Sequence, residues 1–373
     1  MPLLTCFRSV RPRYRTGQRA LLDWLSNVHG AAEATHLGLD AGEPEQFAAR
    51  IAARLRKCAC PPEQIGTRGQ SVIDLATFRG DDHALYDVDL HPRGKGTEAR
   101  TRLFANLVDD YFARAYADEH AAPDDLVHVT CTGYVSPSGA QKLVAQREWS
   151  TRVTHAYHMG CYAAMPALRI AAGFVATGSR RVDIAHTELC SLHLDPSDHR
   201  LEQLVVQSLF ADGLISYRMG PDRGEPGLRV LALHERVLPN SAAAMTWIVG
   251  DAGMQMTLAR DIPDRIAGAL RGFVIDLLRA AGRDVGALRG SVVAVHPGGP
   301  KIIDRVRDVL ELDESQLGFS RGVLFDHGNM SSATLPHVWM RIVDAQEVPA
   351  GTLVPSFAFG PGLTVCGALL EKR

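Results

Sequence analysis

The chain has 373 residues, which is enough for about two domains or for one large fused domain. Hydrophobic residues make up 46% and charged residues 22%, and these ordinary values exclude collagen, coiled coils and disordered tails. The 40 basic and 42 acidic residues nearly balance, which argues against a nucleic-acid-binding protein. The seven cysteines are too dilute for a disulfide scaffold, so we expect a soluble cytoplasmic protein.

No targeting segment is predicted. Residues 1–15 contain four arginines among short apolar runs, whereas a signal peptide needs an apolar stretch of about 7–15 residues. The longest apolar candidate, residues 161–176, is interrupted by Pro166 and Arg169. It is therefore too polar for a membrane-spanning helix, which needs ~18 apolar residues.

Periodicity and turn residues predict an N-terminal region rich in helices. In chain order, the predicted elements are a strand over 3–10, helices over 16–29 and 45–58, a loop over 66–95 and a helix over 97–118.

The remainder of the chain alternates strands with helices, which predicts an α/β fold. Before the Pro- and Gly-rich segment 219–227, the pattern predicts strands over 126–131, 182–192 and 214–217 and helices over 161–177 and 201–209. After it, the pattern predicts strands over 228–234, 291–296, 353–358 and 363–369 and helices over 267–281, 301–310 and 333–343.

Cys161 is the first candidate catalytic residue. It stands between Gly160 and a run of helix formers, so its sulfur is expected near a helix N-terminus that stabilises a thiolate nucleophile. The alternative is a small buried hydrophobic residue. His155, His158 and Cys161 share a three-residue spacing that could also hold zinc, but no fourth ligand accompanies them and the histidines favour a strand or loop.

Two further candidates lie at element ends. His296 follows an apolar strand and precedes the turn Pro-Gly-Gly-Pro, where a neutral imidazole could donate to a carbonyl oxygen or pair with a thiolate. Asn329 precedes Met-Ser-Ser-Ala, and its amide could donate to an oxyanion. Each could instead be a turn or capping residue. The Gly-Pro-Gly turn at 360–362 lacks the Lys-Ser/Thr of a phosphate loop, so we interpret it as a tight turn near the reactive centre.

These segments together resemble the type III polyketide synthases, the chalcone and stilbene synthase-like branch of the thiolase-fold condensing enzymes. The resembling segments run in the family's order from about residue 125 to the C-terminus: 160–161, 208–213, 261–263, 296–300, 328–333 and 359–364. The resemblance implies a thiolase-like, five-layered αβαβα fold with two pseudo-duplicated halves. Residues 1–220 would carry the nucleophilic Cys, and residues 221–373 the His and Asn.

The resemblance also implies roles for individual residues. Cys161 would accept the acyl group, and His296 and Asn329 would bind the extender thioester and stabilise the enolate that decarboxylation leaves. Substrate-binding positions would be Phe210, Met256, Thr132, Cys190, His193 and Ser331, of which Met256, Cys190 and His193 depart from the plant pattern. Coenzyme A would contact Arg54, Arg56, Lys57 and Lys301. The segment 132–137 corresponds to the family's dimer-crossing loop, and we interpret Glu188 as structural.

The expected activity is therefore an acyltransferase of polyketide synthase type. It would perform decarboxylative Claisen condensation of a Cys-bound acyl starter with a malonyl-type thioester, giving an alkylpyrone or related polyketide. Acyl groups would arrive on coenzyme A or acyl carrier protein, with no resident cofactor or metal, and the chain would form a homodimer. The alternatives are a ketosynthase III-like enzyme, an α-pyrone synthase that joins two β-ketoacyl chains, a cysteine hydrolase and a non-catalytic scaffold.

Overall fold

The computed structural model describes residues 1–38, 43–78 and 82–373. Its main feature is a nine-stranded sheet with the order β11-β12-β13-β8-β1-β7-β6-β4-β5. The first half contains β1 (Pro2–Val10), β4 (Asp125–Thr130), β5 (Arg152–Tyr157), β6 (Val182–Leu189) and β7 (Asp212–Pro221). The second half contains β8 (Leu228–Val237), β11 (Ala294–Val295), β12 (Leu353–Gly360) and β13 (Thr364–Lys372).

The two halves of the sheet meet where β1 pairs with β8, through Leu3 and Leu4. Strand β4 runs parallel to β5 and β6, and β11 runs parallel to β12. Strands β12 and β13 form an antiparallel pair joined at the Gly-Pro-Gly turn, as the sequence predicted.

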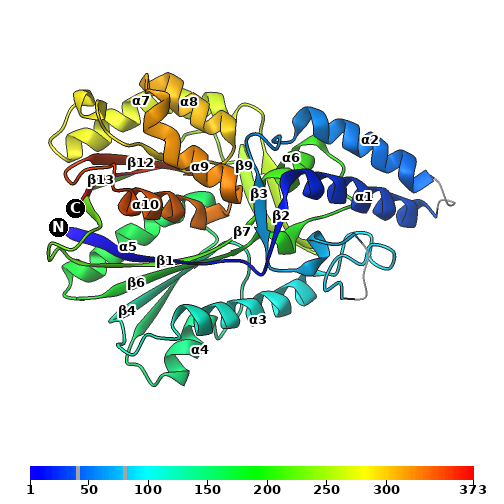
Figure 1. The fold of residues 1–373 in the computed structure, drawn as a ribbon, viewed down its shortest axis with the longest axis horizontal. Helices are drawn as coiled ribbons and strands as arrows, with labels where there is room; N and C mark the ends of the chain where they lie inside the picture. Colours follow the sequence, from blue (N-terminus) through cyan, green and yellow to red (C-terminus); the bar gives the residue numbers. More distant parts are fainter. Residues whose placement is uncertain (39–42, 79–81) are drawn as a thin grey trace.

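Five layers are visible in Figure 1. Helices α5 (Ala164–Ala176) and α10 (Thr334–Asp344) lie between the two halves of the sheet. Helices α7 (Ile262–Ala280) and α8 (Pro300–Leu310) cover one outer face, and α3 (Thr97–Ala115) and α4 (Gly139–Gln146) cover the other. This αβαβα arrangement confirms the predicted thiolase-like fold.

Helices α5 and α10 of the central layer bury their inward faces. On α5 the inward positions are small or aliphatic, and Ala164, Ala167 and Leu168 are fully buried. On α10, Trp339 is fully buried and its indole N–H donates to Ser356 Oγ of β12 at 3.0 Å. Small side chains let both halves of the sheet approach these helices at the packing density of a protein core.

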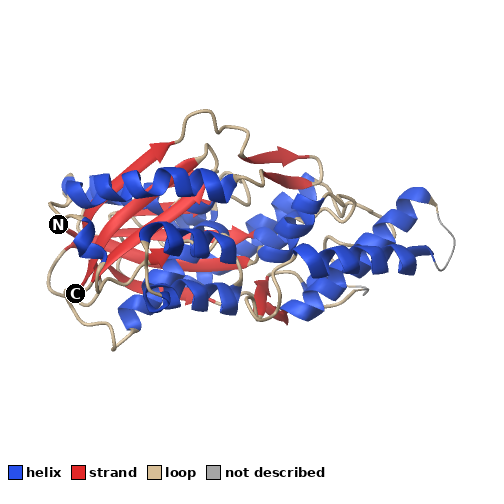
Figure 2. Cartoon of the chain, turned by 90° about the horizontal axis from the view of Figure 1, so that it is seen from above, coloured by secondary structure: helices blue, strands red, loops and turns tan. Residues whose placement is uncertain are grey.

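The remaining elements extend from one end of the layered body. They are α1 (Gln18–Leu37), α2 (Glu43–Cys58), α6 (Leu201–Leu209), the strand pair β2 (Tyr14–Gly17) and β3 (Thr67–Gln70), and the hairpin β9 (Met245–Gly250) with β10 (Gly253–Leu258). Figure 2 shows α1 and α2 projecting away from the sheet at the end opposite the chain termini. Helix α9 (Gly318–His327) precedes the turn that carries Asn329.

Several predicted boundaries are wrong. The predicted loop over 66–95 contains β3 and the 3₁₀ turn η1 (Ile73–Leu75), because β3 pairs with β2, a contact that local periodicity does not reveal. Residues 79–81 of that segment lie outside the described residues. The helix predicted from 161 begins at Ala164, and only Ala294–Val295 of the strand predicted over 291–296 are in the sheet. The domain boundary at 220/221 stays a prediction.

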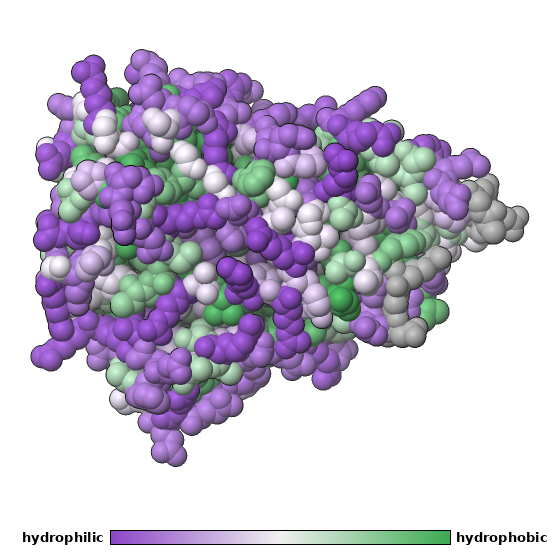
Figure 3. Space-filling view, viewed as in Figure 1, coloured by the Kyte–Doolittle hydropathy of each residue, from purple (hydrophilic) through white to green (hydrophobic). Residues whose placement is uncertain are grey.

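The polarity of the surface is that of a protein whose apolar residues are buried between the layers. The face in Figure 3 is mostly hydrophilic, with small apolar groups scattered over it. Within the described residues, no helix is both long and apolar enough to span a membrane.

Candidate active site

Cys161 lies in the 3₁₀ turn η2 (Gly160–Tyr162), immediately before α5. The preceding Gly160 has a left-handed φ of 79°, and a Cβ at this position would lie 2.6 Å from Pro361 Cδ. A glycine is therefore required here for both conformation and space. The Gly-Pro-Gly turn after β12 thus packs beside Cys161, as predicted.

The Cys161 sulfur is contacted by the turn that precedes α10. Ser331 Oγ lies 4.0 Å from Cys161 Sγ, and the side chain of Asn329 acts with it to lower the pKa of the thiol. Asn329 Oδ1 accepts the Ser331 N–H at 2.9 Å, which leaves the amide NH₂ available as a donor in this site. The structure therefore brings together two of the three predicted catalytic residues.

Burial dominates the electrostatics of the thiol. It raises the pKa of Cys161 to about 12, and the nearby charge of Glu188 raises it further, while Ser331 and Asn329 act in the opposite direction. For the free site the prediction of a stabilised thiolate is wrong, because burial raises the pKa of the thiol. Cys161 holds its proton at neutral pH.

His296 is buried at the end of β11, where its backbone N–H donates to Phe357 O at 2.7 Å. Burial lowers the pKa of its ring to about 3, so the imidazole is neutral. Neither ring nitrogen has a hydrogen-bond partner among the described residues. Unpartnered buried polar atoms are costly, and such an atom is typical of a group kept for a substrate.

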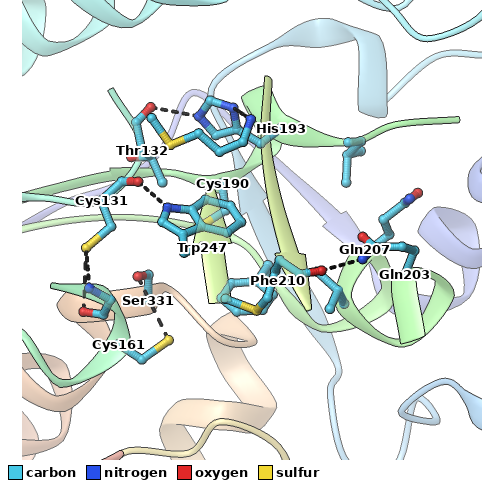
Figure 4. A pocket seen from close by; sticks show the side chains of 15 residues that line it. Cys131, Thr132, Cys161, Cys190, His193, Gln203, Gln207, Phe210, Trp247 and Ser331 are labelled. Carbon is cyan, nitrogen blue, oxygen red and sulfur yellow. Dashed lines mark hydrogen bonds between the residues drawn. The ribbon is translucent and has the colours of Figure 1, made fainter. Parts of the chain in front are cut away.

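Cys161 lies on the wall of a narrow cavity of about 30 Å³, which in the free protein is smaller than the usual small-molecule site. Figure 4 shows Cys161 and Ser331 at one end and Gln203 and Gln207 of α6 at the other, with Phe210 and Trp247 between them. Every predicted substrate-binding residue lines this cavity: Thr132, Cys190, His193, Phe210, Met256 and Ser331. Their role in binding substrate stays a prediction.

The sequence reasoning missed Trp247, the largest side chain of the cavity wall. Its indole N–H donates to Cys131 O at 2.6 Å, and its ring packs edge-on against His193 at 6.1 Å between centroids. Trp247 belongs to β9, whose hairpin was not predicted. The signal was the Gly-Asp-Ala-Gly run at 250–253, which joins two apolar stretches by a turn.

The predicted coenzyme A contacts lie outside the cavity. Arg54, Arg56 and Lys57 are exposed on α2, and Lys301 is exposed on α8. None of the four forms an ion pair within the described parts of the chain. These cations are free to meet an anionic ligand, and their assignment to coenzyme A stays a prediction.

The alternative metal site gains no support. His155 lies in β5 and hydrogen-bonds Ser138 Oγ at 2.9 Å, and His158 Nε2 hydrogen-bonds Trp247 O at 2.8 Å. No cluster of three or more His, Cys, Asp or Glu residues suited to a metal occurs in the part of the chain that the structure describes.

The known proteins that are similar to this chain are polyketide synthases and their relatives. Residues 230–372 match the family of chalcone and stilbene synthases, C-terminal domain. Type III polyketide synthase C of Arabidopsis thaliana is 31% identical over 258 residues, which are 66% of this chain and 67% of that protein. Probable polyketide synthase 1 of Dictyostelium discoideum is 29% identical over 283 residues, 73% of this chain, which span only 9% of that much longer protein.

Solved structures share the complete fold. The C-terminal type III polyketide synthase domain of a Dictyostelium type I/III hybrid superimposes with a TM-score of 0.82 at 24% identity, covering 100% of this chain and 99% of that one. 1,3,6,8-Tetrahydroxynaphthalene synthase from Streptomyces coelicolor gives a TM-score of 0.79 at 22% identity, covering 100% and 99%. At these identities the similarity establishes the fold alone.

The raised pKa of Cys161 predicts how its reactivity depends on pH. In the free protein the rate of Cys161 alkylation by iodoacetamide should rise roughly tenfold per pH unit from about pH 8 to 10, since only the thiolate reacts. Mass spectrometry of the peptide that contains Cys161 measures this rate. A rate that levels off below pH 8 would show a stabilised thiolate and contradict the prediction.

Proposed function

Because the chain belongs to the type III polyketide synthase family, we propose that it is an acyltransferase that extends a Cys161-bound acyl group by decarboxylative condensation with a malonyl-type thioester. One observation carries the proposal: a buried thiol on the wall of a narrow cavity, with Ser331 Oγ 4.0 Å from its sulfur and the side chain of Asn329 lowering its pKa. A buried cysteine with only a packing role needs neither the cavity nor the polar neighbours.

The first step loads the enzyme. The Cys161 sulfur attacks the carbonyl carbon of an acyl thioester, a new C–S bond forms, and the C–S bond to the carrier breaks. Since Cys161 holds its proton in the free site, that proton must leave as the sulfur attacks. The neutral imidazole of His296 is the proposed acceptor, and it returns the proton to the departing carrier thiol.

The second step makes the carbon–carbon bond. The malonyl thioester loses CO₂, and the electron pair of the broken C–C bond moves into an enolate whose oxygen needs hydrogen-bond donors. The NH₂ of Asn329 and the N–H of His296 are the proposed donors, each worth ~10²–10³ in rate. The enolate carbon then attacks the Cys161 acyl carbonyl, and the sulfur leaves as a thiolate.

The cavity favours an acyl chain over a bulky aromatic starter. Met256 and Trp247 line the space beyond Cys161, and Met is flexible enough to adapt to a linear chain. An alkylpyrone or a related polyketide is therefore the proposed product.

The exposed cations of α2 support delivery by an anionic carrier. Arg54, Arg56 and Lys57 occupy the last turns of α2, and Lys301 lies in the first turn of α8. Their charges suit the phosphates of coenzyme A or an acidic acyl carrier protein. A cytoplasmic location follows from the same chemistry, because Cys161 must stay reduced.

We also propose that two copies of the chain form a homodimer across β5. This strand is the last of the sheet, so its edge has no partner strand among the described residues. Beside it, the rings of Tyr134 and His158 lie 5.4 Å apart, and His158 holds the β9 hairpin. On that hairpin Ile248 and Val249 are 60% and 47% exposed, which a second copy would cover.

Substitution of the proposed catalytic residues should separate the two steps. Incubation with an acyl thioester should give a stable adduct on Cys161, and malonyl thioester should then yield CO₂ and a lengthened product. Cys161→Ala should abolish the product and keep some malonyl decarboxylation. His296→Ala should lower decarboxylation by ~10²-fold, since one donor is lost. Cys190→Ala, which removes another buried cavity thiol, should leave the adduct on Cys161.

The measurements are intact mass, CO₂ release and product mass, with the acyl group supplied on coenzyme A and, in parallel, on acyl carrier protein. Absence of an adduct with any acyl chain would exclude the condensing enzyme. Release of free acid without extension would indicate a hydrolase. Unchanged decarboxylation in His296→Ala would exclude its role as a donor.

Trp247 should limit the length of the product. Trp247→Ala removes the largest side chain of the wall, and products should lengthen by at least one extender unit because the cavity gains volume. Trp247→Phe keeps most of the bulk and loses only the hydrogen bond to Cys131 O, so its products should keep their length. Mass spectrometry of the products checks both variants, and unchanged lengths in Trp247→Ala would refute the proposed limit.

Sedimentation equilibrium tests the dimer. The protein should sediment at twice its chain mass of 40.5 kDa, and a double substitution of Ile248 and Val249 by Asp should shift it toward the monomer. The reason is that each charge would be buried in the interface at a cost of several kcal/mol. A wild-type protein that sediments as a monomer contradicts the proposal.

A further inference from the structure

A chain of buried polar side chains runs from the cavity wall into the core behind Cys161. Thr132 Oγ1 donates to Glu188 Oε2 at 3.1 Å, and Ser332 Oγ donates to Glu188 Oε1. Ser332 Oγ lies 2.9 Å from His186 Nδ1, and His186 Nε2 lies 3.1 Å from the Tyr217 hydroxyl. None of the five side chains is more than 1% exposed. Thr132 is the end that reaches the cavity (Figure 4).

The chemistry of these groups fixes the direction of the hydrogen bonds. An ionised Glu188 only accepts, so Ser332 gives its single proton to Glu188 and must accept from His186 Nδ1–H. Burial lowers the pKa of His186 to about 3, so the ring is neutral and its Nε2 accepts from Tyr217. Every donor in the chain therefore points toward the carboxylate of Glu188.

The same series of hydrogen bonds can also stabilise a protonated Glu188, if each hydrogen bond reverses its direction. A protonated Glu188 donates to Ser332, Ser332 donates to His186 Nδ1, and Nε2–H donates to the Tyr217 oxygen. Burial raises the pKa of Glu188 to about 7, against the bonds from Ser332, Cys131 and Thr132. The two arrangements therefore exchange near neutral pH, and the ring of His186 changes tautomer when they do.

Two adjacent residues, Ser331 and Ser332, connect this series of hydrogen bonds to Cys161. Ser332 bonds Glu188, while its neighbour Ser331 lies against Cys161 Sγ. The charge of Glu188 also acts on Cys161 directly and opposes its ionisation. A carboxylate beside a thiol makes the thiolate less favourable, since two negative charges would share one dry site.

We propose that His186 is a positioning residue that, through Ser332, holds Glu188 ionised beside Cys161 and so sets the pH range in which the thiol reacts. The inference rests on the proposed function only in taking Cys161 as the nucleophile. His186 touches neither the cavity nor the sulfur, and it acts through Ser332 alone.

The other titratable groups around these hydrogen bonds do not supply the negative charge that acts on Cys161. Facing Glu188, the thiols of Cys131 and Cys190 stay neutral because burial raises their pKa well above the usual range. Facing His186, burial lowers the pKa of His128 to about 3 and that of His337 to about 4, so both are neutral. Asp212 faces Cys190, and its carboxylate accepts from Ser191 and from the Ser71 N–H.

Alkylation of Cys161 by iodoacetamide, followed by mass spectrometry at several pH values, tests the proposal in the folded full-length chain. Glu188→Gln removes the charge, and at about pH 8.5 its Cys161 should react at least ~3-fold faster than wild type. His186→Leu and Ser332→Ala should show the same increase, because Ser332→Ala removes a donor to Glu188 and His186→Leu removes the donor that orients Ser332 toward it. At about pH 6, where Glu188 is protonated in the wild type and in the variants that keep it, the rates should converge with that of Glu188→Gln.

Double variants and controls separate positioning from disruption. His186→Leu combined with Glu188→Gln should react no faster than Glu188→Gln alone, since both act through one charge. His186→Gln, whose amide can donate to Ser332, should return toward wild type. His29→Leu makes the same substitution at a fully buried histidine of α1 and should leave the rates unchanged.

Slower or unchanged alkylation in both His186→Leu and Ser332→Ala at pH 8.5 would overturn the proposal, as would additive effects in the double variant. If His186→Leu does not fold, the nearly isosteric Ser332→Ala decides. The alkylation assay uses no acyl substrate, so it can be interpreted even if the protein performs no condensation. Equally, a negative alkylation result would not exclude the proposed condensation.

Discussion

Helices α5 and α10 begin at the same place between the two halves of the sheet, and their packing there brings Cys161 to Asn329. The turn before α5 carries the thiol, and the turn before α10 carries the amide and Ser331. Both helices are enclosed by sheet on each side, so neither turn can shift without opening the core. Residues that are 168 positions apart in the sequence are thereby held in one geometry.

The same enclosure determines the charges. Desolvation disfavours every buried ion, so it raises the pKa of the Cys161 thiol and the Glu188 carboxyl and lowers that of the His296 imidazole. The free site therefore holds a thiol and a neutral imidazole. Its reactivity depends on groups that move protons when an acyl thioester enters and on the Glu188 carboxyl, whose pKa burial raises to about 7.

The cavity has a rigid end and an adjustable end. Near Cys161, its wall is fixed by hydrogen bonds from Trp247 to Cys131 and from His193 to Thr132. Toward α6, the wall includes Met254 and Met256 of β10, whose side chains can repack around an acyl chain. Because Trp247, Met254 and Met256 all belong to the β9–β10 hairpin, the shape of the cavity depends on long-range contacts rather than on the catalytic turns.

The sequence by itself determined the α/β fold and the three catalytic candidates, because strand and helix periodicities are local and because Cys161, His296 and Asn329 lie in recognisable turns. It also placed the β12–β13 turn beside the reactive centre. It could not find β3 and the β9 hairpin, since pairing with distant strands decides them, and it therefore missed Trp247. It predicted a stabilised thiolate where burial raises the pKa of the thiol, because local context shows the helix start and not the depth of burial. Glu188 was predicted to be structural, and only the tertiary structure, by joining β6 to the turn before α10, places its charge beside Cys161.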